Sequence, residues 1–395
     1  MSNDSAAAEH AMSARIHETH SGIIVLVGDK AYKAKKPVTT EFLDFSTPAR
    51  REQVCAREVE LNSRLAPASY LGVAHLTLPG GGPPEPVIVM RRHPDAARLA
   101  TMVRGSDPSG AVAAALHAIA ATVAGFHDTA RRGRPIDAQG TVTAVGRRWQ
   151  DNFTEMAAFT GEVISAVRLQ EIRRLAAAYL AGRSVLFTRR ITDRRIVDGH
   201  GDLLADDIFW LPDGVQILDC LEFDDNLRYV DVIDDIAFLA MDLEFLGRRD
   251  LADIFVEEYR AATDDDAPAS LLGFYVAYRA LVRAKTDCVR FTQGHTESRP
   301  AARRHLDIAI DQLRALTVRL TLVGGGPGTG KTTLAHHLAE QVGAEVVSTD
   351  EIRRELQDSG EISGAAGTLD AGLYAPQHVD AVYAAMFRRA RLLLA

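Results

Sequence analysis

Residues 324–333 read GGGPGTGKTT, which contains the spacing GxxxxGK[ST] known as a Walker A motif or P-loop. An apolar run at 318–323 precedes it and a helix-like stretch at 332–341 follows it. In this context glycines let successive backbone N–H groups surround phosphates at a helix N-terminus. The pattern predicts a nucleotide site in which Lys331 reaches the β- and γ-phosphates and the Thr332 hydroxyl binds Mg²⁺. The residues predicted to form it are Gly325, Gly326, Pro327, Gly328, Thr329, Gly330, Lys331, Thr332 and Thr333.

A second group of residues that could do chemistry lies earlier in the chain. The sequence HGD at 200–202 is followed by Asp207, and an apolar strand at 215–218 then leads into Asp219. Because a loop and a hairpin join them, the carboxylates of Asp202 and Asp219 can converge on one point. Phosphoryl transfer needs such a pair, a base for the proton of the attacking hydroxyl and acidic ligands for the Mg²⁺ on ATP. A solvated acidic loop is the alternative interpretation.

This stretch resembles the signature of the aminoglycoside phosphotransferase-like kinases, a branch of the protein-kinase-like fold. That signature is HGDxxxxN, an Ile-Asp strand end and a downstream Asp-x-x-x-Asp-Leu-Ala, and this chain has HGD at 200–202, Asp219, Asp231 and 235–237. The resemblance implies that Asp202 is the catalytic base and Asp219 a Mg²⁺ ligand, with mainly structural roles for Asp231 and Asp235. Asp207 stands where the family usually has Asn. An acid can also bind Mg²⁺, but a carboxylate does not donate the hydrogen bond of an amide.

The resemblance also implies a lysine for the α- and β-phosphates and a helix glutamate that holds it. Lys33 and Lys35 lie on one predicted strand and point to the same face, so both are candidates, and we prefer Lys33. Glu58 is the candidate partner, with Glu60 as the alternative. Solvated surface lysines are the other interpretation. No GxGxxG precedes these residues, so residues 19–22 would have to cover the phosphates.

Charge around the second group bears on the acceptor. Between Asp198 and Glu244 there are fourteen acidic residues and one basic residue, Arg228. One interpretation is a cationic acceptor such as an amino sugar, attracted by an acidic cleft. The other is internal ion pairing with Mg²⁺ and with Arg279, Arg283 and Lys285 of a predicted helix. The predicted acceptor is therefore a small molecule with a hydroxyl group, and its charge stays open.

From the sequence we expect three parts. Residues 1–13 are expected to be disordered, and residues 14–315 to form an α+β protein-kinase-like domain with a small β-rich lobe (14–95) and a large helical lobe (96–315). Residues 316–395 are expected to form an α/β P-loop domain. The predicted elements are a hairpin around Gly28-Asp29, a helix at 49–65, a strand at 87–90, and helices at 109–128, 143–159, 162–181, 248–262 and 270–293, with only short strands and turns at 185–230.

The C-terminal part contains a second candidate group. A strand-like run at 345–348 leads into TDEIR at 349–353, which resembles P-loop small-molecule and polynucleotide kinases and the zeta-toxin-like group. The resemblance implies that Asp350 activates an acceptor hydroxyl and that Arg353 clamps a phosphate or the acceptor. A helix N-cap at Thr349 or Asp350 is the alternative. Only two strands of such a sheet can be recognised, so we expect a truncated domain that binds nucleotide without catalysing transfer.

Composition limits the classes of function. A net charge of −8 argues against a general nucleic-acid or membrane-surface role. Three scattered cysteines fit a reducing compartment, and MSNDSAAAEH at the start lacks the order of a secretion signal. The longest apolar stretch, 111–126, is interrupted by His117 and is short for a membrane span. We therefore expect a cytoplasmic protein.

Together these features resemble fusions described as bifunctional phosphotransferase/ATP-binding proteins. The predicted activity is transfer of phosphate from ATP, with Mg²⁺, to a hydroxyl of a sugar, an amino sugar or an aminoglycoside-like molecule. The alternative is a nucleotide-sensing regulatory protein whose kinase-like domain is catalytically degenerate because of Asp207.

Overall fold

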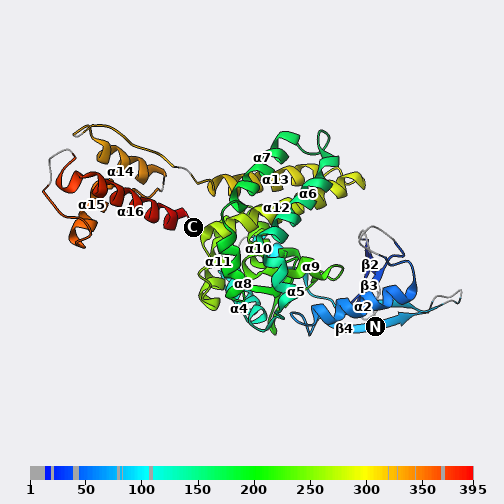
Figure 1. Ribbon diagram of the computed structural model, residues 1–395. Coiled ribbons are helices and arrows are strands. Elements are labelled where there is room, and N and C mark those ends of the chain that lie inside the picture. Colours follow the sequence, from blue (N-terminus) through cyan, green and yellow to red (C-terminus); the bar gives the residue numbers. More distant parts are fainter. Residues whose placement is uncertain are drawn as a thin grey trace. The chain divides into compact units, whose positions relative to one another are not determined.

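The structure, a computed structural model, describes residues 14–18, 22–38, 44–77, 81, 83–105, 110–318, 320–326, 328–342, 344–365 and 370–394. The chain divides into two compact units, Met1–Leu316 and Thr317–Ala395 (Figure 1). Three expectations fall outside the described residues. They are the disordered start at 1–13, residues 19–21 of the loop over the phosphates, and Pro327 of the P-loop.

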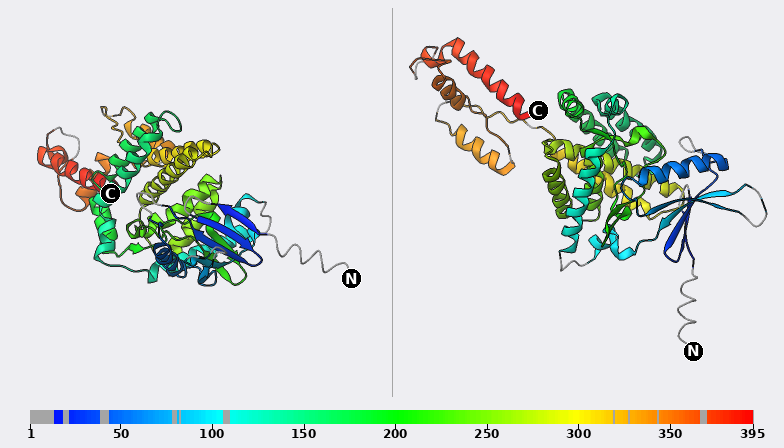
Figure 2. Two further views of the ribbon diagram at one scale, coloured as in Figure 1. Left: turned by 90° about the vertical axis from the view of Figure 1, so that its right-hand side faces the viewer. Right: turned by 90° about the horizontal axis from the view of Figure 1, so that it is seen from below.

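The small lobe of the first unit is a five-stranded antiparallel sheet of order β1-β2-β3-β5-β4. Its strands are β1 (Arg15–Glu18), β2 (Gly22–Val27), β3 (Lys30–Lys35), β4 (Tyr70–Leu76) and β5 (Glu85–Arg91). The predicted hairpin joins β2 to β3, and Gly28 takes the left-handed backbone (φ 56°) that such a turn requires. Helix α2 (Pro48–Asn62) packs on β4 and β5 (Figures 1 and 2). The side chain of its N-cap Thr47 accepts the N–H of Arg50.

The large lobe is helical, and its buried apolar side chains form one core. Its helices are η1 (Asp95–Ala97), α3 (Leu99–Arg104), α4 (Ala111–Thr129), α5 (Arg134–Asp137), η2 (Ala138–Gly140), α6 (Val142–Met156), η3 (Ala157–Phe159), α7 (Ala166–Leu180), α8 (Ser184–Thr192), η4 (Ala205–Asp207), α9 (Asp225–Arg228), α10 (Val232–Phe245), α11 (Arg249–Thr263), α12 (Ala269–Thr292) and α13 (Ser298–Ala315). The small β-rich lobe and the large helical lobe confirm the protein-kinase-like fold class expected from the sequence.

Several helices were not among those expected from the sequence, including α3, α8, α10 and α13. Helix α8 lies in the stretch for which only short strands and turns were expected. Helix α10 was not predicted, and the structure gives the reason: eleven of its fourteen residues are buried. A helix buried on nearly every side has no polar face, so the apolar periodicity that reveals a helix is absent from its sequence.

Helix α4 is longer than the apolar stretch considered in the sequence. Among the described residues, it is the one helix long and apolar enough to cross a membrane by length and composition. Half of that window is buried within the lobe, where Leu116, Ile119 and Val123 belong to the common core. A core helix meets the same length and composition criteria.

Two short ribbons carry the HGD loop and the loop with Asp219. Strand β6 (Ile196–Asp198) pairs with β9 (Tyr229–Asp231), and β7 (Ile208–Leu211) pairs with β8 (Gly214–Ile217). The HGD loop leaves β6, and the loop with Asp219 leaves β8. The Leu218 N–H donates to the Asp207 backbone oxygen at 2.9 Å, so the ribbons bring the two loops together.

The second unit contains α14 (Lys331–Val342), α15 (Thr349–Asp358), η5 (Gly372–Tyr374) and α16 (Pro376–Leu394). Helices α15 and α16 share a small core that includes Ile352, Leu356 and Val382. The strands expected at 318–323 and 345–348 are not formed among the described residues of this unit. A parallel strand needs paired neighbours for its backbone groups, and the sequence pattern alone could not show whether they are present.

Candidate active site

Four residues meet where the small lobe faces the loop with Asp219. The Lys33 ammonium lies 2.8 Å from Glu58 of α2 and 2.8 Å from Asp219. The Lys35 ammonium lies 2.6 Å from the other oxygen of Glu58. Both candidate lysines therefore share one glutamate. The alternative glutamate, Glu60, is exposed and pairs with Arg57 instead.

The surroundings distinguish the two lysines. Lys35 is buried, with 1% of its side chain exposed, and its second partner is Glu222 at 2.7 Å. Lys33 is 13% exposed, and its second partner, Asp219, is 47% exposed. Burial opposes the charge of Lys33, but the carboxylates of Asp219 and Glu58 outweigh it and raise its pKa. Lys33 is thus the more exposed of the two lysines, and it lies beside the more exposed carboxylate, Asp219.

The carboxylate of Asp235 holds the backbone of the HGD loop in place. It accepts the backbone N–H of His200 at 2.7 Å and that of Gly201 at 2.8 Å. Burial alone would raise the pKa of Asp235, but hydrogen bonding with His127 and the His200 backbone lowers it. Gly199 has no room for a side chain, because a carbon there would lie 2.5 Å from the Asp235 oxygen. The loop conformation is therefore fixed by its supporting carboxylate.

His200 links the two loops of the site. Its Nε2 lies 3.1 Å from the Leu218 carbonyl, while its Nδ1 accepts the Asp202 N–H at 3.3 Å. Burial lowers the pKa of His200 to about 4, so the ring is neutral at pH 7. A neutral ring that accepts at Nδ1 carries its proton on Nε2 and donates it to the carbonyl. His200 is therefore a positioning group between Asp202 and Asp219.

Three carboxylates crowd the open side of these loops. Burial raises the pKa of Asp202 to about 6, and nearby Asp219 adds to this shift while the Arg283 guanidinium opposes it. Burial, together with the charges of Asp219 and Asp202, also raises the pKa of Asp207 well above its usual range. Among the described residues, no group of three or more His, Cys, Asp or Glu side chains is arranged to hold a metal ion. Mg²⁺ is usually bound through one or two carboxylates together with water and substrate phosphates, so the oxygen donors of Asp207 and Asp219 fit the predicted metal.

Most of the acidic stretch is paired within the protein. Nine of the fourteen acidic side chains between Asp198 and Glu244 lie within ion-pair distance of Arg or Lys: Asp198, Asp206, Asp213, Asp219, Glu222, Asp225, Asp231, Asp234 and Glu244. Of the cations expected to meet this stretch, Arg279 pairs with Asp234 at 2.7 Å. Lys285 pairs with Glu155 instead, outside the stretch. Internal pairing thus accounts for most of the negative charge.

Three supporting residues were not anticipated from the sequence. His127 at the end of α4 hydrogen-bonds to Asp235 at 3.0 Å and to the Tyr259 hydroxyl at 2.8 Å. Arg64 donates to the backbone oxygens of Asp198 and Gly199, each at 3.0 Å. Glu222 is the second partner of Lys35. These partners are far apart in the sequence, so no local pattern points to them.

The P-loop of the second unit has the backbone of a glycine turn before a helix. Gly328 and Gly330 have left-handed backbones (φ 74° and 81°), and α14 begins at Lys331. The Lys331 ammonium donates to the Gly326 carbonyl at 2.6 Å, and the Thr329 hydroxyl donates to the same oxygen at 2.8 Å. Lys331 is thus held beside the loop that it would serve in phosphate binding.

The second candidate pair of this unit is in contact. The guanidinium of Arg353 lies 2.8 Å from Asp350 and packs over the ring of Tyr374, with its carbon 4.4 Å from the ring centroid. The N-cap of α15 is Ser348, whose hydroxyl accepts the Glu351 N–H, so the N-cap alternative at Thr349 or Asp350 is wrong. The Asp350 side chain is 72% exposed and open to solvent.

Comparison with known proteins finds similarities for both parts of the chain. Residues 320–395 match the family described as an AAA domain. Among solved structures, the GDP and kanamycin complex of APH(2")-IIia has a TM-score of 0.49 at 12% identity, covering 78% of this chain and 94% of that one. The choline/ethanolamine kinase family protein from Mesorhizobium loti has a TM-score of 0.43 at 14% identity, covering 86% and 100%.

Two mycobacterial proteins are similar along nearly the whole chain. The uncharacterized protein Rv2004c of Mycobacterium tuberculosis is 56% identical over 379 residues, which cover 96% of this chain and 76% of that protein. The uncharacterized protein Mb2027c of Mycobacterium bovis matches with the same identity and coverage. The chain therefore belongs to the protein family of Rv2004c and Mb2027c.

Proposed function

We propose that the first unit is an ATP- and Mg²⁺-dependent phosphotransferase that moves the γ-phosphate to a hydroxyl group of a small molecule. The observation that carries this proposal is the contact of Lys33 with both Glu58 and Asp219, at 2.8 Å each. Kinases of this fold need a strand lysine held by a helix glutamate and an acidic Mg²⁺ ligand beside it. The HGD loop adds Asp202, a carboxylate next to the same centre.

Each residue has one task in this proposal. Lys33, oriented by Glu58, neutralises phosphate oxygens of ATP. Asp219 and Asp207 would hold Mg²⁺, which supplies charge neutralisation on the phosphates when it is bound. Asp202 accepts the proton of the acceptor hydroxyl as the oxygen attacks phosphorus. His200 and Asp235 keep the loop that carries Asp202 in place.

The second unit is proposed to bind nucleotide through its P-loop without supplying the transfer chemistry. The glycine turn before α14 and the position of Lys331 support binding. The Asp350–Arg353 pair is a candidate for acceptor contacts, yet Asp350 is tied to Arg353 rather than poised beside Lys331 by any contact among the described residues. The first unit is therefore the proposed catalyst.

The proposal is tested by incubating the protein with ATP, Mg²⁺ and a pooled library of metabolites and amino sugars. Phosphorylated products are identified by mass spectrometry. At least one product that depends on the protein, ATP and Mg²⁺ is expected. ATP binding without any product would instead favour the nucleotide-sensing alternative, which is motivated by Asp207 in the position of an amide.

The pH profile should report the ionisation of Asp202. Because its pKa is raised to about 6, the carboxyl is protonated below that pH and cannot accept a proton. We therefore expect kcat/KM to fall about tenfold per pH unit below the free-enzyme pKa, and to be level above it. Steady-state rates at saturating ATP and low acceptor, measured from pH 5 to pH 8, give the profile. A profile that stays level down to pH 5, as expected for an aspartate with an ordinary pKa of about 3.9, would contradict this assignment.

The two lysines on Glu58 should separate function from stability. Lys33→Ala removes a preorganised charge from the open side of the site, so kcat/KM should fall by about 10²–10³ with little change in the melting temperature. Lys35→Ala leaves Glu58 and Glu222 without their buried partner, so its main effect should be a lower melting temperature. Kinetics and thermal denaturation of both variants check this. If both variants lose the same activity and keep the same melting temperature, the two lysines do not have the separate roles assigned here.

A further inference from the structure

Three guanidinium groups around the HGD loop are bound to other parts of the protein. Arg64 donates to two backbone oxygens just before the loop, each at 3.0 Å. Arg228 is buried and pairs with two carboxylates, at 2.9 and 2.6 Å. Arg279 of α12 pairs with Asp234 at 2.7 Å and donates to the Gly201 carbonyl at 3.0 Å. These three groups therefore support the conformation of the loop.

A fourth guanidinium, that of Arg283, lies one turn further along α12. Residues four apart share one face of a helix, so Arg283 follows Arg279 along the face that meets the HGD loop. Helix α10 packs against this face, and its Phe238 ring lies 4.8 Å from the Arg279 guanidinium carbon. One turn along α10, Asp242 accepts the Ala205 N–H at 2.9 Å. Arg283 is thus placed beside the residues that follow HGD.

The charge of Arg283 acts on the proposed base, but its donors are unused. Burial raises the pKa of Asp202, and of the charged groups that act on Asp202, Arg283 has the largest effect and lowers the pKa. Burial also raises the pKa of Asp242, and both the Ala205 N–H and Arg283 oppose this rise. Among the described residues, Arg283 forms no hydrogen bond or ion pair, and its buried Nε has no partner.

The charge of the catalytic loops is unfavourable for a phosphate group. Asp202, Asp207 and Asp219 lie close enough for their charges to act on one another. The acidic stretch that contains them has one basic residue, Arg228, which is buried and paired. A phosphoryl group in transfer carries negative charge on three oxygens, which these carboxylates would repel. A guanidinium with free donors beside the base would offset that repulsion.

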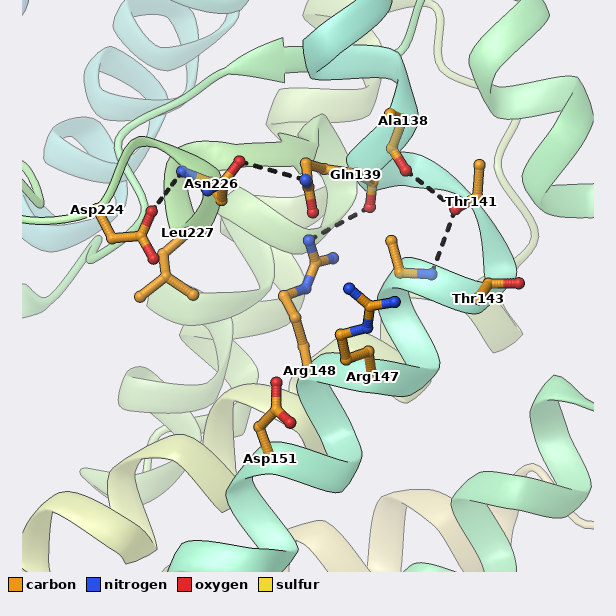
Figure 3. Close-up of a pocket in the computed structure, with 11 residues that line it drawn as sticks. Ala138, Gln139, Thr141, Thr143, Arg147, Arg148, Asp151, Asp224, Asn226 and Leu227 are labelled. Carbon is orange, nitrogen blue, oxygen red and sulfur yellow. Dashed lines mark hydrogen bonds between the residues drawn. The ribbon is translucent and has the colours of Figure 1, made fainter. Parts of the chain in front are cut away.

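The cavity of the helical lobe does not supply such a charge. This cavity of about 390 Å³ lies between α6 and α9 (Figure 3). Two arginines and two aspartates line it, so its charge balances: Arg147, Arg148, Asp151 and Asp224. The Arg148 guanidinium donates to a backbone carbonyl at 3.3 Å (Figure 3). No contact among the described residues directs the Asp202 carboxylate into this cavity. The candidate cation for the transferred group is therefore on α12.

We propose that Arg283 is a further catalytic residue, whose guanidinium binds oxygens of the phosphoryl group as it passes from ATP to the acceptor. This inference rests on the proposed phosphotransferase function. In the transfer, the bond from phosphorus to the bridging oxygen of ADP breaks, and ADP keeps the electron pair. The acceptor oxygen bonds to phosphorus and gives its proton to Asp202. Arg283 keeps its own proton and neutralises charge on the phosphoryl oxygens that do not react.

The test uses a mimic of the phosphoryl group in transfer, so that it needs no identified acceptor. Calorimetric titrations of the full chain compare ADP and Mg²⁺ with ADP, Mg²⁺ and aluminium fluoride. Every protein in this test carries Lys331→Ala, which weakens the P-loop site. Aluminium fluoride should tighten the binding of ADP by at least about 10²-fold, as expected of a transition-state analogue. Arg283→Gln should reduce that gain by about 10²-fold, the effect of one electrostatic donor, with the affinity for ADP alone unchanged.

Two further variants complete the test. Lys285→Gln removes a charge from the same helix, but Lys285 pairs with Glu155 at 3.0 Å, so the gain should be kept. Arg283→Lys keeps the charge beside Asp202 and loses the planar pair of donors, so the gain should fall only in part.

Three results would overturn the role of Arg283. A full gain in Arg283→Gln would do so and leave the phosphotransferase function standing. An equal loss of affinity for ADP alone would show that Arg283 is structural. No gain without Arg283→Gln would also overturn the proposal, and product formation on the pooled acceptors would then show separately whether the phosphotransferase function stands.

Discussion

Asp202→Asn should lower kcat/KM by about 10²–10⁴, the range for removing a general base. Asn has the same shape but cannot accept the proton of the attacking hydroxyl. The loop should keep its conformation, because Asp235 holds it through the backbone N–H groups of His200 and Gly201. ATP binding should therefore be unchanged. Steady-state kinetics on the acceptor found in the library, with ATP affinity from calorimetry, measure both quantities.

Asp206→Asn is the matched control for this variant. Asp206 belongs to the same loop, but its carboxylate is 59% exposed and lies 3.7 Å from Arg104. Its replacement should leave kcat/KM near the wild-type value. Wild-type turnover in Asp202→Asn would show that another group accepts the proton, and equal losses in both variants would point to a loop that tolerates no substitution.

Arg190→Met should destabilise the first unit by about 3–5 kcal/mol, the cost of breaking a buried ion pair. Arg190 is 3% exposed and donates to both oxygens of Asp231 at 2.7–2.8 Å and both oxygens of Asp265 at 2.6–2.8 Å. Its removal leaves Asp231 without a cation and Asp265 with only the more distant Arg195, at 3.7 Å. Asp231 also caps α10, which supports the HGD loop through Asp235. Chemical denaturation at pH 7 measures the change in unfolding free energy.

The neighbouring Arg189 gives the control. It also pairs with two carboxylates, Asp193 and Asp266, but its side chain is 61% exposed. Arg189→Met should therefore cost at most about 1 kcal/mol. A similar cost for both variants would mean that burial does not govern these pairs.

The stability loss in Arg190→Met should also depend on pH. Burial tends to raise the pKa of Asp265, but hydrogen bonds from Arg190 outweigh it and lower that pKa. A carboxyl with a lowered pKa stabilises the fold above its unfolded value, about 3.9, and loses that contribution as pH falls through its folded value. The difference between wild type and Arg190→Met should therefore be full at pH 7 and shrink as the solution is acidified.

Residues that are close in sequence were the ones whose arrangement could be foreseen. The HGD loop and the strand before Asp219 are local patterns, and the hairpin at Gly28 followed from its turn residues. The two lysines on one face of β3 followed from the strand repeat. Glu222 could not be foreseen, since 187 residues separate it from Lys35 and no pattern links them.

Two further differences have physical causes. Buried helices such as α10 carry no polar face, so their periodicity is hidden. In the second unit the apolar run at 318–323 predicts a strand, yet Leu320 and Leu322 are 79% and 83% exposed and no ladder partner is present among the described residues. An apolar run indicates only that a segment could be buried. Whether it pairs as a strand depends on neighbouring strands that its own sequence does not reveal.

The central claim is that the first unit, not the P-loop unit, transfers phosphate. The most direct measurement compares product formation by the wild-type protein, Asp202→Asn and Lys331→Ala on the same pooled acceptors with ATP and Mg²⁺. The account predicts that Lys331→Ala still forms the product and that Asp202→Asn does not. A product that persists in Asp202→Asn and disappears in Lys331→Ala would place the chemistry in residues 317–395 and contradict the account.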